Sequence, residues 1–119
     1  MNEWNVLACL HTLLPVADDE RGDLLAICRA SAETLTARLK DTADPTDPRL
    51  ARAAAGHAYY SYMLRKCAED AEMTYFKAGD VTVHRAGDAV LVRAAKVRDE
   101  LMLPALELLR DDGFLFRSV

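Results

Sequence analysis

The side chains that most often ligate metals or act as nucleophiles are widely separated in this sequence. Its three histidines form no HxxxH pair, and together with its three cysteines they show no spacing typical of a zinc site. These residues are His11, His57, His84, Cys9, Cys28 and Cys67. Each cysteine lies within an apolar helical pattern, so we interpret all three as small core residues in a reducing compartment. The sequence therefore predicts neither a bound metal nor a disulfide framework.

Patterns that build catalytic sites are also missing from the sequence. There is no GxSxG nucleophile elbow, no Walker-type phosphate loop and no GxGxxG turn. Cys67 follows Lys66, but adjacent residues on a helix point apart, so the lysine is not expected to activate the thiol. No carboxylate stands alone in an apolar run, where burial would raise its pKa for acid–base work. We therefore expect no cofactor and no enzymatic activity, and a small enzyme is the least favoured alternative.

Length and composition predict one small domain. The chain has 119 residues, of which 51% are hydrophobic and 29% charged, and alanine and leucine are frequent. This composition favours a soluble, mainly α-helical fold. The net charge of −4, with basic residues interleaved among acidic ones, argues against specific nucleic acid binding. No apolar run reaches the roughly 20 residues that span a bilayer, and the N-terminal stretch, which carries Glu3, does not resemble a signal peptide.

The longest helix is predicted over Pro48–Glu72. Asp47 can cap its free N–H groups, and proline suits the first helical position. Mostly small side chains recur on one face at steps of four and three, so another helix can approach closely. This face comprises Leu50, Ala54, His57, Ser61, Leu64, Ala68 and Ala71. We interpret the helix as the core of a small bundle; the alternative is that Tyr59 and Tyr62, on its other side, also meet a neighbouring subunit.

Three further helices complete a predicted small bundle of four. They cover residues 2–14, 18–40 and 87 to about 110, the last with a kink or a new turn at Pro104. The stretch 41–47, DTADPTD, is rich in proline and aspartate and is predicted to be a linker. Trp4 is expected to close one end of the core, with a docking anchor as the alternative.

A short β element is predicted beside the helices. The β-formers at 75–84 indicate a strand or hairpin, with a turn or bulge at 78–80. A hairpin that pairs 81–83 with 90–92 is the alternative to a helix from 87. Residues 114–119 form a candidate C-terminal strand. Because ordering a free segment costs about 1–2 kcal/mol per residue, this strand is expected to pair, either within the chain or with a neighbour.

The order of these elements resembles small prophage proteins of the head–tail connector, or head-completion adaptor, family. Two motifs carry the resemblance, YFKAGDVTV at 75–83 and LRDDGFLF at 109–116, and it covers most of the chain. The resemblance implies a mostly helical adaptor with a small β element, which assembles as a ring of identical copies beneath the portal of a capsid. It also implies contacts with the portal protein on one side and a stopper or tail-completion protein on the other.

The resemblance implies two interaction segments, one at 75–84 and one at 114–119. The candidate contact residues are Tyr75, Phe76, Lys77, Asp80, Val81, Val83, Phe114, Leu115, Phe116 and Arg117. The implied location is the head–tail junction of the virion, after a period in the bacterial cytoplasm. The sequence by itself agrees that a terminal strand with apolar residues on both faces would seek a partner, and a heterologous contact of this kind can close a ring. The alternative function is a small helical regulatory or protein-binding module that dimerises through the helix at 48–72.

Overall fold

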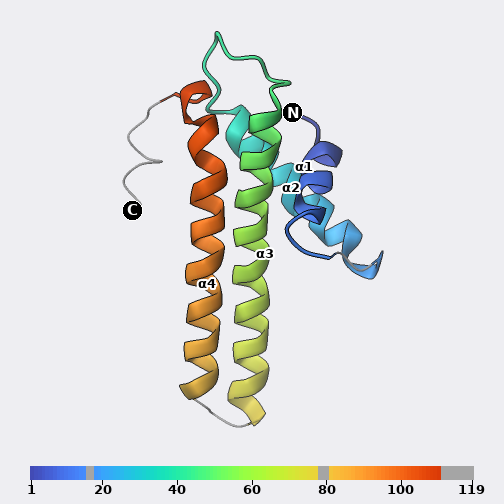
Figure 1. Ribbon diagram of the computed structural model, residues 1–119. Coiled ribbons are helices and arrows are strands. Elements are labelled where there is room, and N and C mark those ends of the chain that lie inside the picture. The colour runs from blue at the N-terminus through green and yellow to red at the C-terminus, as the bar shows by residue number, and fades with distance from the viewer. Residues whose placement is uncertain (16–17, 78–80, 111–119) are drawn as a thin grey trace.

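A computed structural model describes the backbone of residues 1–15, 18–77 and 81–110, and the side chains of these residues except those at 18, 70–77 and 81–88. Within this part, the chain forms four α-helices and two short 3-10 helices, and no strand (Figure 1). In chain order they are α1 (Glu3–His11), η1 (Asp18–Glu20), α2 (Arg21–Thr36), α3 (Pro48–Lys77), α4 (Val81–Met102) and η2 (Leu103–Leu108). The predicted mainly helical, four-helix fold is confirmed.

The start of α3 follows the prediction. The Oδ1 atom of Asp47 accepts a hydrogen bond from the backbone N–H of Arg49 at 2.9 Å, as expected of a helix cap. The guanidinium of Arg49 also bonds the same carboxylate, and these bonds lower the pKa of Asp47 to about 2. The helix then continues to Lys77, beyond its predicted end at Glu72.

The second helix is shorter than predicted because the chain after it pairs with the end of the bundle. Residues Leu39 and Leu109 form an isolated antiparallel β-bridge. The backbone N–H of Lys40 donates to the carbonyl oxygen of Leu108 at 3.0 Å, and that of Arg110 donates to Arg38 at 2.7 Å. These bonds hold the start of the linker against the segment that follows η2.

The prediction of a β element near 75–84 is wrong over the residues that the structure describes. Residues 75–77 end α3, and residues 81–83 begin α4, which also contains 90–92, so the alternative hairpin is wrong too. Strand preference spans only about 1 kcal/mol and depends on a pairing partner. Packing of α4 along α3 replaces that partner here. The turn predicted at 78–80 and the strand predicted at 114–119 lie outside the described residues.

The fourth helix begins at Val81, earlier than the predicted start at residue 87. It ends at Met102, and Pro104 lies in the first turn of η2. Proline has no N–H to donate, which is tolerated where a helix begins. The predicted new turn at Pro104 is therefore confirmed.

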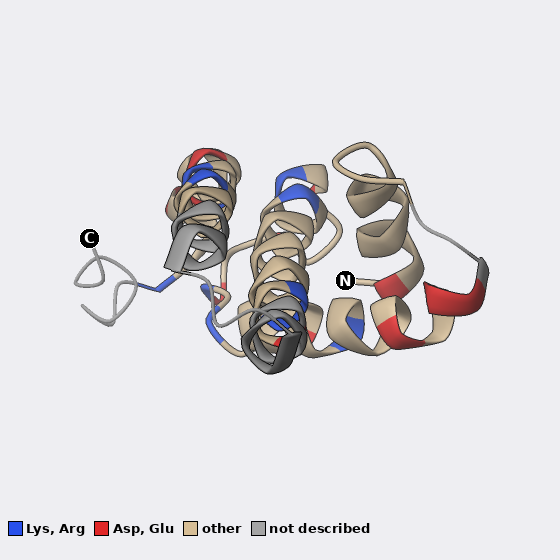
Figure 2. Ribbon diagram, turned by 90° about the horizontal axis from the view of Figure 1, so that it is seen from below, with Lys and Arg blue, Asp and Glu red and all other residues tan. Residues whose placement is uncertain are grey.

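The helices pack in a layered order with α3 in the middle. Figure 2, a view along the bundle, shows α4 on one side of α3 and the α1–α2 pair on the other. Among the residues that the structure describes, α4 packs against α3 and η2 but against neither α1 nor α2. The main core consists of Val6, Leu7, Leu10, Leu24, Cys28, Ala32, Leu35, Leu50, Ala53, Ala54, Ala55, Ala58, Ala105 and Leu109. The core therefore lies chiefly between α1, α2 and the first half of α3.

The half of the α3–α4 hairpin that contains the end of α3 and the start of α4 projects beyond this core (Figure 1). Helix α3 has 30 residues, which gives a length of about 45 Å, and the molecule measures 53 × 34 × 19 Å. On the predicted small-residue face, Leu50 and Ala54 are buried, whereas Leu64 is 47% exposed. The face continues along the helix, but α1 and α2 cover only its first half.

Candidate protein-interaction surface

The first predicted interaction segment lies at the free end of the projecting hairpin. Part of it belongs to the last turn of α3 and part to the first turn of α4. The candidates placed there are Tyr75, Phe76, Lys77, Val81 and Val83, whose backbone alone is described; Asp80 lies outside the described residues. Two helix ends therefore bring both parts of the segment to the tip of the molecule (Figure 1).

The second predicted segment follows Arg110, the last residue that the structure describes. Its candidates, Phe114, Leu115, Phe116 and Arg117, all lie outside the described residues. Arg110 is bonded to the linker side of the bundle, and Arg49 in the first turn of α3 forms an ion pair with Glu107 of η2. The chain therefore leaves the bundle at the end opposite the hairpin tip.

The outer face of α4 is an exposed surface that our reading of the sequence did not single out. The sequence predicts an apolar stripe for this helix at Val90, Ala94, Val97, Leu101, Ala105 and Leu108, and all of these side chains are buried or half-buried. On the other side, Val92 is 69% exposed and is flanked by exposed Arg93 and Lys96. Val92 is off the predicted stripe, and an apolar side chain off a helical stripe is the signal that could have pointed to this face.

Trp4 and Tyr62, the aromatic side chains named above as possible contacts, differ in their exposure. Trp4 is 55% exposed, so the expectation that it closes the core is wrong; Val6, Leu7 and Leu10 occupy the buried side of α1 instead. Tyr62 is half-buried, and its hydroxyl donates a hydrogen bond of 2.7 Å to Glu20. Tyr62 is thus engaged within the chain, while Trp4 is available at the surface.

The serine–histidine pair of the fold is a packing contact. Nδ1 of His57 lies 3.0 Å from Oγ of Ser31, a hydrogen bond whose donor depends on the imidazole tautomer. Burial, followed by the nearby charge of Arg98, lowers the pKa of His57. Because Ser31 is only 1% exposed, its hydroxyl cannot reach a substrate from solvent. His57, which lies on the predicted small-residue face of α3, is therefore a hydrogen-bonded packing residue.

A second polar cluster joins the start of α2 to α3. Glu20 accepts from Tyr62 and pairs with Lys66 at 3.4 Å, and the bond from Tyr62 is the main reason that the pKa of Glu20 is lowered. The cluster borders a small pocket of about 240 Å³. Its acidic and basic groups pair with one another, which is the pattern of a structural ion-pair network.

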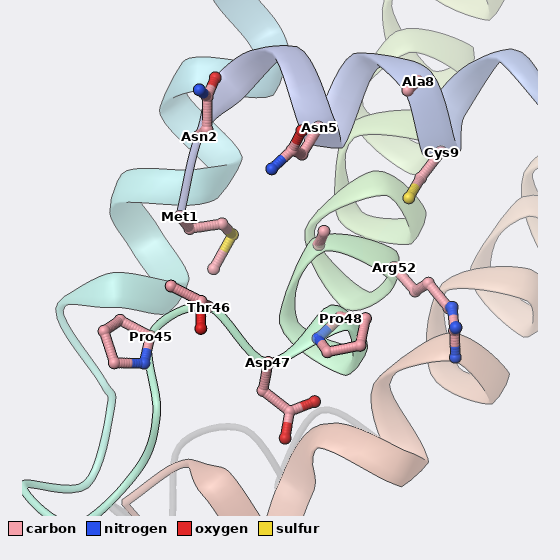
Figure 3. A pocket seen from close by; sticks show the side chains of 11 residues that line it. Met1, Asn2, Asn5, Ala8, Cys9, Pro45, Thr46, Asp47, Pro48 and Arg52 are labelled. Carbon is pink, nitrogen blue, oxygen red and sulfur yellow. The ribbon is translucent and has the colours of Figure 1, made fainter.

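The larger pocket, of about 770 Å³, lies between the start of α1, the linker and the first turns of α3. Figure 3 shows Met1 and Cys9 pointing into it from the α1 side. The lining includes one thiol and the guanidinium of Arg52, but no histidine that could act as a base. This combination indicates no particular reaction.

Other features bear on the class of site. No three described His, Cys, Asp or Glu side chains gather as metal ligands would. Over the described residues, no helix is both long and apolar enough to cross a bilayer. Comparison of the chain with family models, curated proteins and solved structures gives no match. The surfaces that remain as candidates are the hairpin tip, the exit of the chain at Arg110 and the outer face of α4.

Proposed function

We propose that the chain is a structural virion assembly protein of the head–tail connector class, which forms a ring on the portal of a tailed phage or prophage. The resemblance of the motifs at 75–83 and 109–116 suggests the class. On this proposal the protein acts at the head–tail junction, carries no catalytic site and works by holding two other proteins together.

The observation that carries the proposal is the separation of the two predicted interaction segments. The segment at 75–83 lies at one end of the molecule, and residues 111–119 follow Arg110 at the other. The longest dimension of the molecule is 53 Å. An adaptor between a portal and a stopper needs contact regions on two sides, and this arrangement supplies two.

The projecting half of the hairpin also supports a role in protein contact. A two-helix hairpin buries less apolar surface than a bundle, and Leu64 and Val92 remain exposed along it. In the described part of the chain, neither α1 nor α2 packs against α4. A partner protein would cover side chains that the chain itself leaves open.

The test is binding to the portal protein encoded in the same prophage, measured by light scattering and by negative-stain imaging of rings. Two variants probe the two ends: deletion of 114–119, and Tyr75→Ala combined with Phe76→Ala. We expect each to weaken portal binding by about tenfold or more, because truncating interface aromatics commonly removes more than 1 kcal/mol. Trp4→Ala, which changes an exposed aromatic that belongs to neither segment, is the control and is expected to bind like the wild type.

Circular dichroism separates loss of binding from loss of folding, since both variants are expected to keep their helicity. A wild-type chain that stays monomeric and ignores the portal would contradict the proposal. A dimer that survives deletion of 114–119 unchanged would instead favour the regulatory or protein-binding module.

A further inference from the structure

The outer face of α4 carries two basic side chains that the described part of the molecule leaves unpaired. Arg93 and Lys96 are exposed on the side of the helix turned away from the buried Ala94, and neither forms an ion pair with a described residue. Val92 beside them is 69% exposed. Further along the helix, Asp99 pairs with Arg98 and the exposed Glu100 lies one turn from Lys96, so the excess of basic charge rests on Arg93 and Lys96.

The opposite edge of the molecule carries the complementary charge. The start of α2 lies at the edge farthest from α4, with α3 between them (Figure 2). Asp19 and Asp23 are exposed there and pair with no described residue, whereas Glu20 is already held by Tyr62 and Lys66. Arg21 is also exposed in this stretch, so the excess of acidic charge rests on the two aspartates.

The two charged stretches lie roughly one helical turn apart along the bundle. A Cβ atom on Gly56 of α3 would lie 3.3 Å from the Cα of Arg98 on α4, which sets the register of the two helices. Toward the hairpin tip, Lys96 and Arg93 follow Arg98 by about 3 and 7.5 Å, at about 1.5 Å per residue. By the same rise, Tyr62 and Lys66, the partners of Glu20 on α3, lie about 9 and 15 Å beyond Gly56.

We propose that the outer face of α4 around Arg93 and Lys96 binds the acidic start of α2, at Asp19 and Asp23, on a second copy of the chain. Each copy uses two different patches, so the contact is heterologous, as a ring requires. This inference rests on the proposed ring-forming function and names the contact between its subunits.

Charge reversal tests the contact in the full chain. One variant combines Arg93→Glu with Lys96→Glu, and the other combines Asp19→Lys with Asp23→Lys. By sedimentation velocity at low ionic strength, where exposed charges are least screened, we expect each variant alone to lose self-association. An equimolar mixture of the two, and the chain with all four substitutions, should both recover it, because each then presents opposite charges across every contact.

The control combines Lys40→Glu with Arg52→Glu, at exposed positions near the linker. It lowers the net charge of the chain by the same amount as Arg93→Glu with Lys96→Glu does. It is expected to associate like the wild type. Association that persists in both reversal variants would overturn this contact and leave the portal-ring proposal standing. A wild-type chain that remains monomeric at high concentration would also overturn this contact. The portal-binding measurement tests the ring proposal independently of this contact.

Discussion

At the scale of single residues, His57 shows how the bundle changes the chemistry of a side chain. It lies on α3 between Ser31 of α2, to which it is hydrogen bonded, and Arg98 of α4. Burial disfavours the charged imidazolium, and the cation of Arg98 disfavours it further, so the pKa of His57 is lowered from 6.5. The sequence pattern indicated a packed histidine. The direction in which its pKa shifts depends on neighbours from two other helices.

This lowered pKa predicts how stability depends on pH. The unfolded chain binds a proton at His57 at higher pH than the folded chain does, so the contribution of His57 is complete above about pH 6.5 and is lost as the pH falls below it. Urea unfolding between about pH 7.5 and 5.5 measures this loss. His57→Gln should flatten the dependence, whereas His11→Gln, an exposed control, should keep it; equal curves for both would contradict the assignment.

At the scale of elements, the close approach of α3 and α4 depends on Gly56. A Cβ atom at this position would lie 3.2 Å from the Cβ of Leu101 and 3.3 Å from the Cα of Arg98. These atoms belong to the body of α4, so the helix itself would have to move. The small side chains of α3 thus serve helix packing, as predicted. The close contact with α4, however, is made at Gly56, which lies beside the predicted face.

We therefore expect Gly56→Ala to destabilise the fold by about 1–3 kcal/mol, although alanine is the better helix former. Gly22→Ala is the matched control, because nothing lies within 4 Å of a Cβ at Gly22. It should be neutral or stabilising by up to about 1 kcal/mol. Chemical denaturation of both variants measures the difference, and a stabilised Gly56→Ala protein would show that α4 yields easily.

At the scale of the whole molecule, the fold is uneven. The first half of α3 is enclosed by α1, α2 and α4, whereas its second half packs mainly on α4, apart from the bond of Lys66 to Glu20 (Figure 1). Local stability follows the density of buried contacts. The projecting half of the hairpin is thus the part of the molecule most open to change when another protein binds it.

Amide hydrogen exchange along α3 should reveal this unevenness. We expect residues 62–69 to exchange at least about tenfold faster than residues 50–58, since a tenfold difference needs only about 1.4 kcal/mol. Protection of 62–69 should rise when the chain assembles with other copies or with a portal. Uniform exchange along α3 in the monomer would mean that the hairpin opens only with the whole fold.

The sequence alone was sufficient to predict the class of fold and several local features. Alanine and leucine content, helical stripes and the Asp47–Pro48 start all act through neighbouring residues, so they predicted four helices and the start of α3. The same local signals wrongly predicted a strand near 75–84 and the burial of Trp4. The valines at 81 and 83 prefer a strand only where another strand can pair with them, and here α3 is the neighbour.

Tertiary structure decided which faces of these helices are covered. Leu50 and Leu64 belong to one helical face, and no pattern in the sequence separates them; Leu50 is buried in the core, whereas Leu64 is left half exposed. In the same way, the packing of α2 and α4 on opposite sides of α3 separates the exposed Arg93 and Lys96 of α4 from the exposed Asp19 and Asp23 at the start of α2. Periodicity reports the direction in which a side chain points along its own helix, whereas exposure depends on whether another element, distant in the sequence, arrives to cover it.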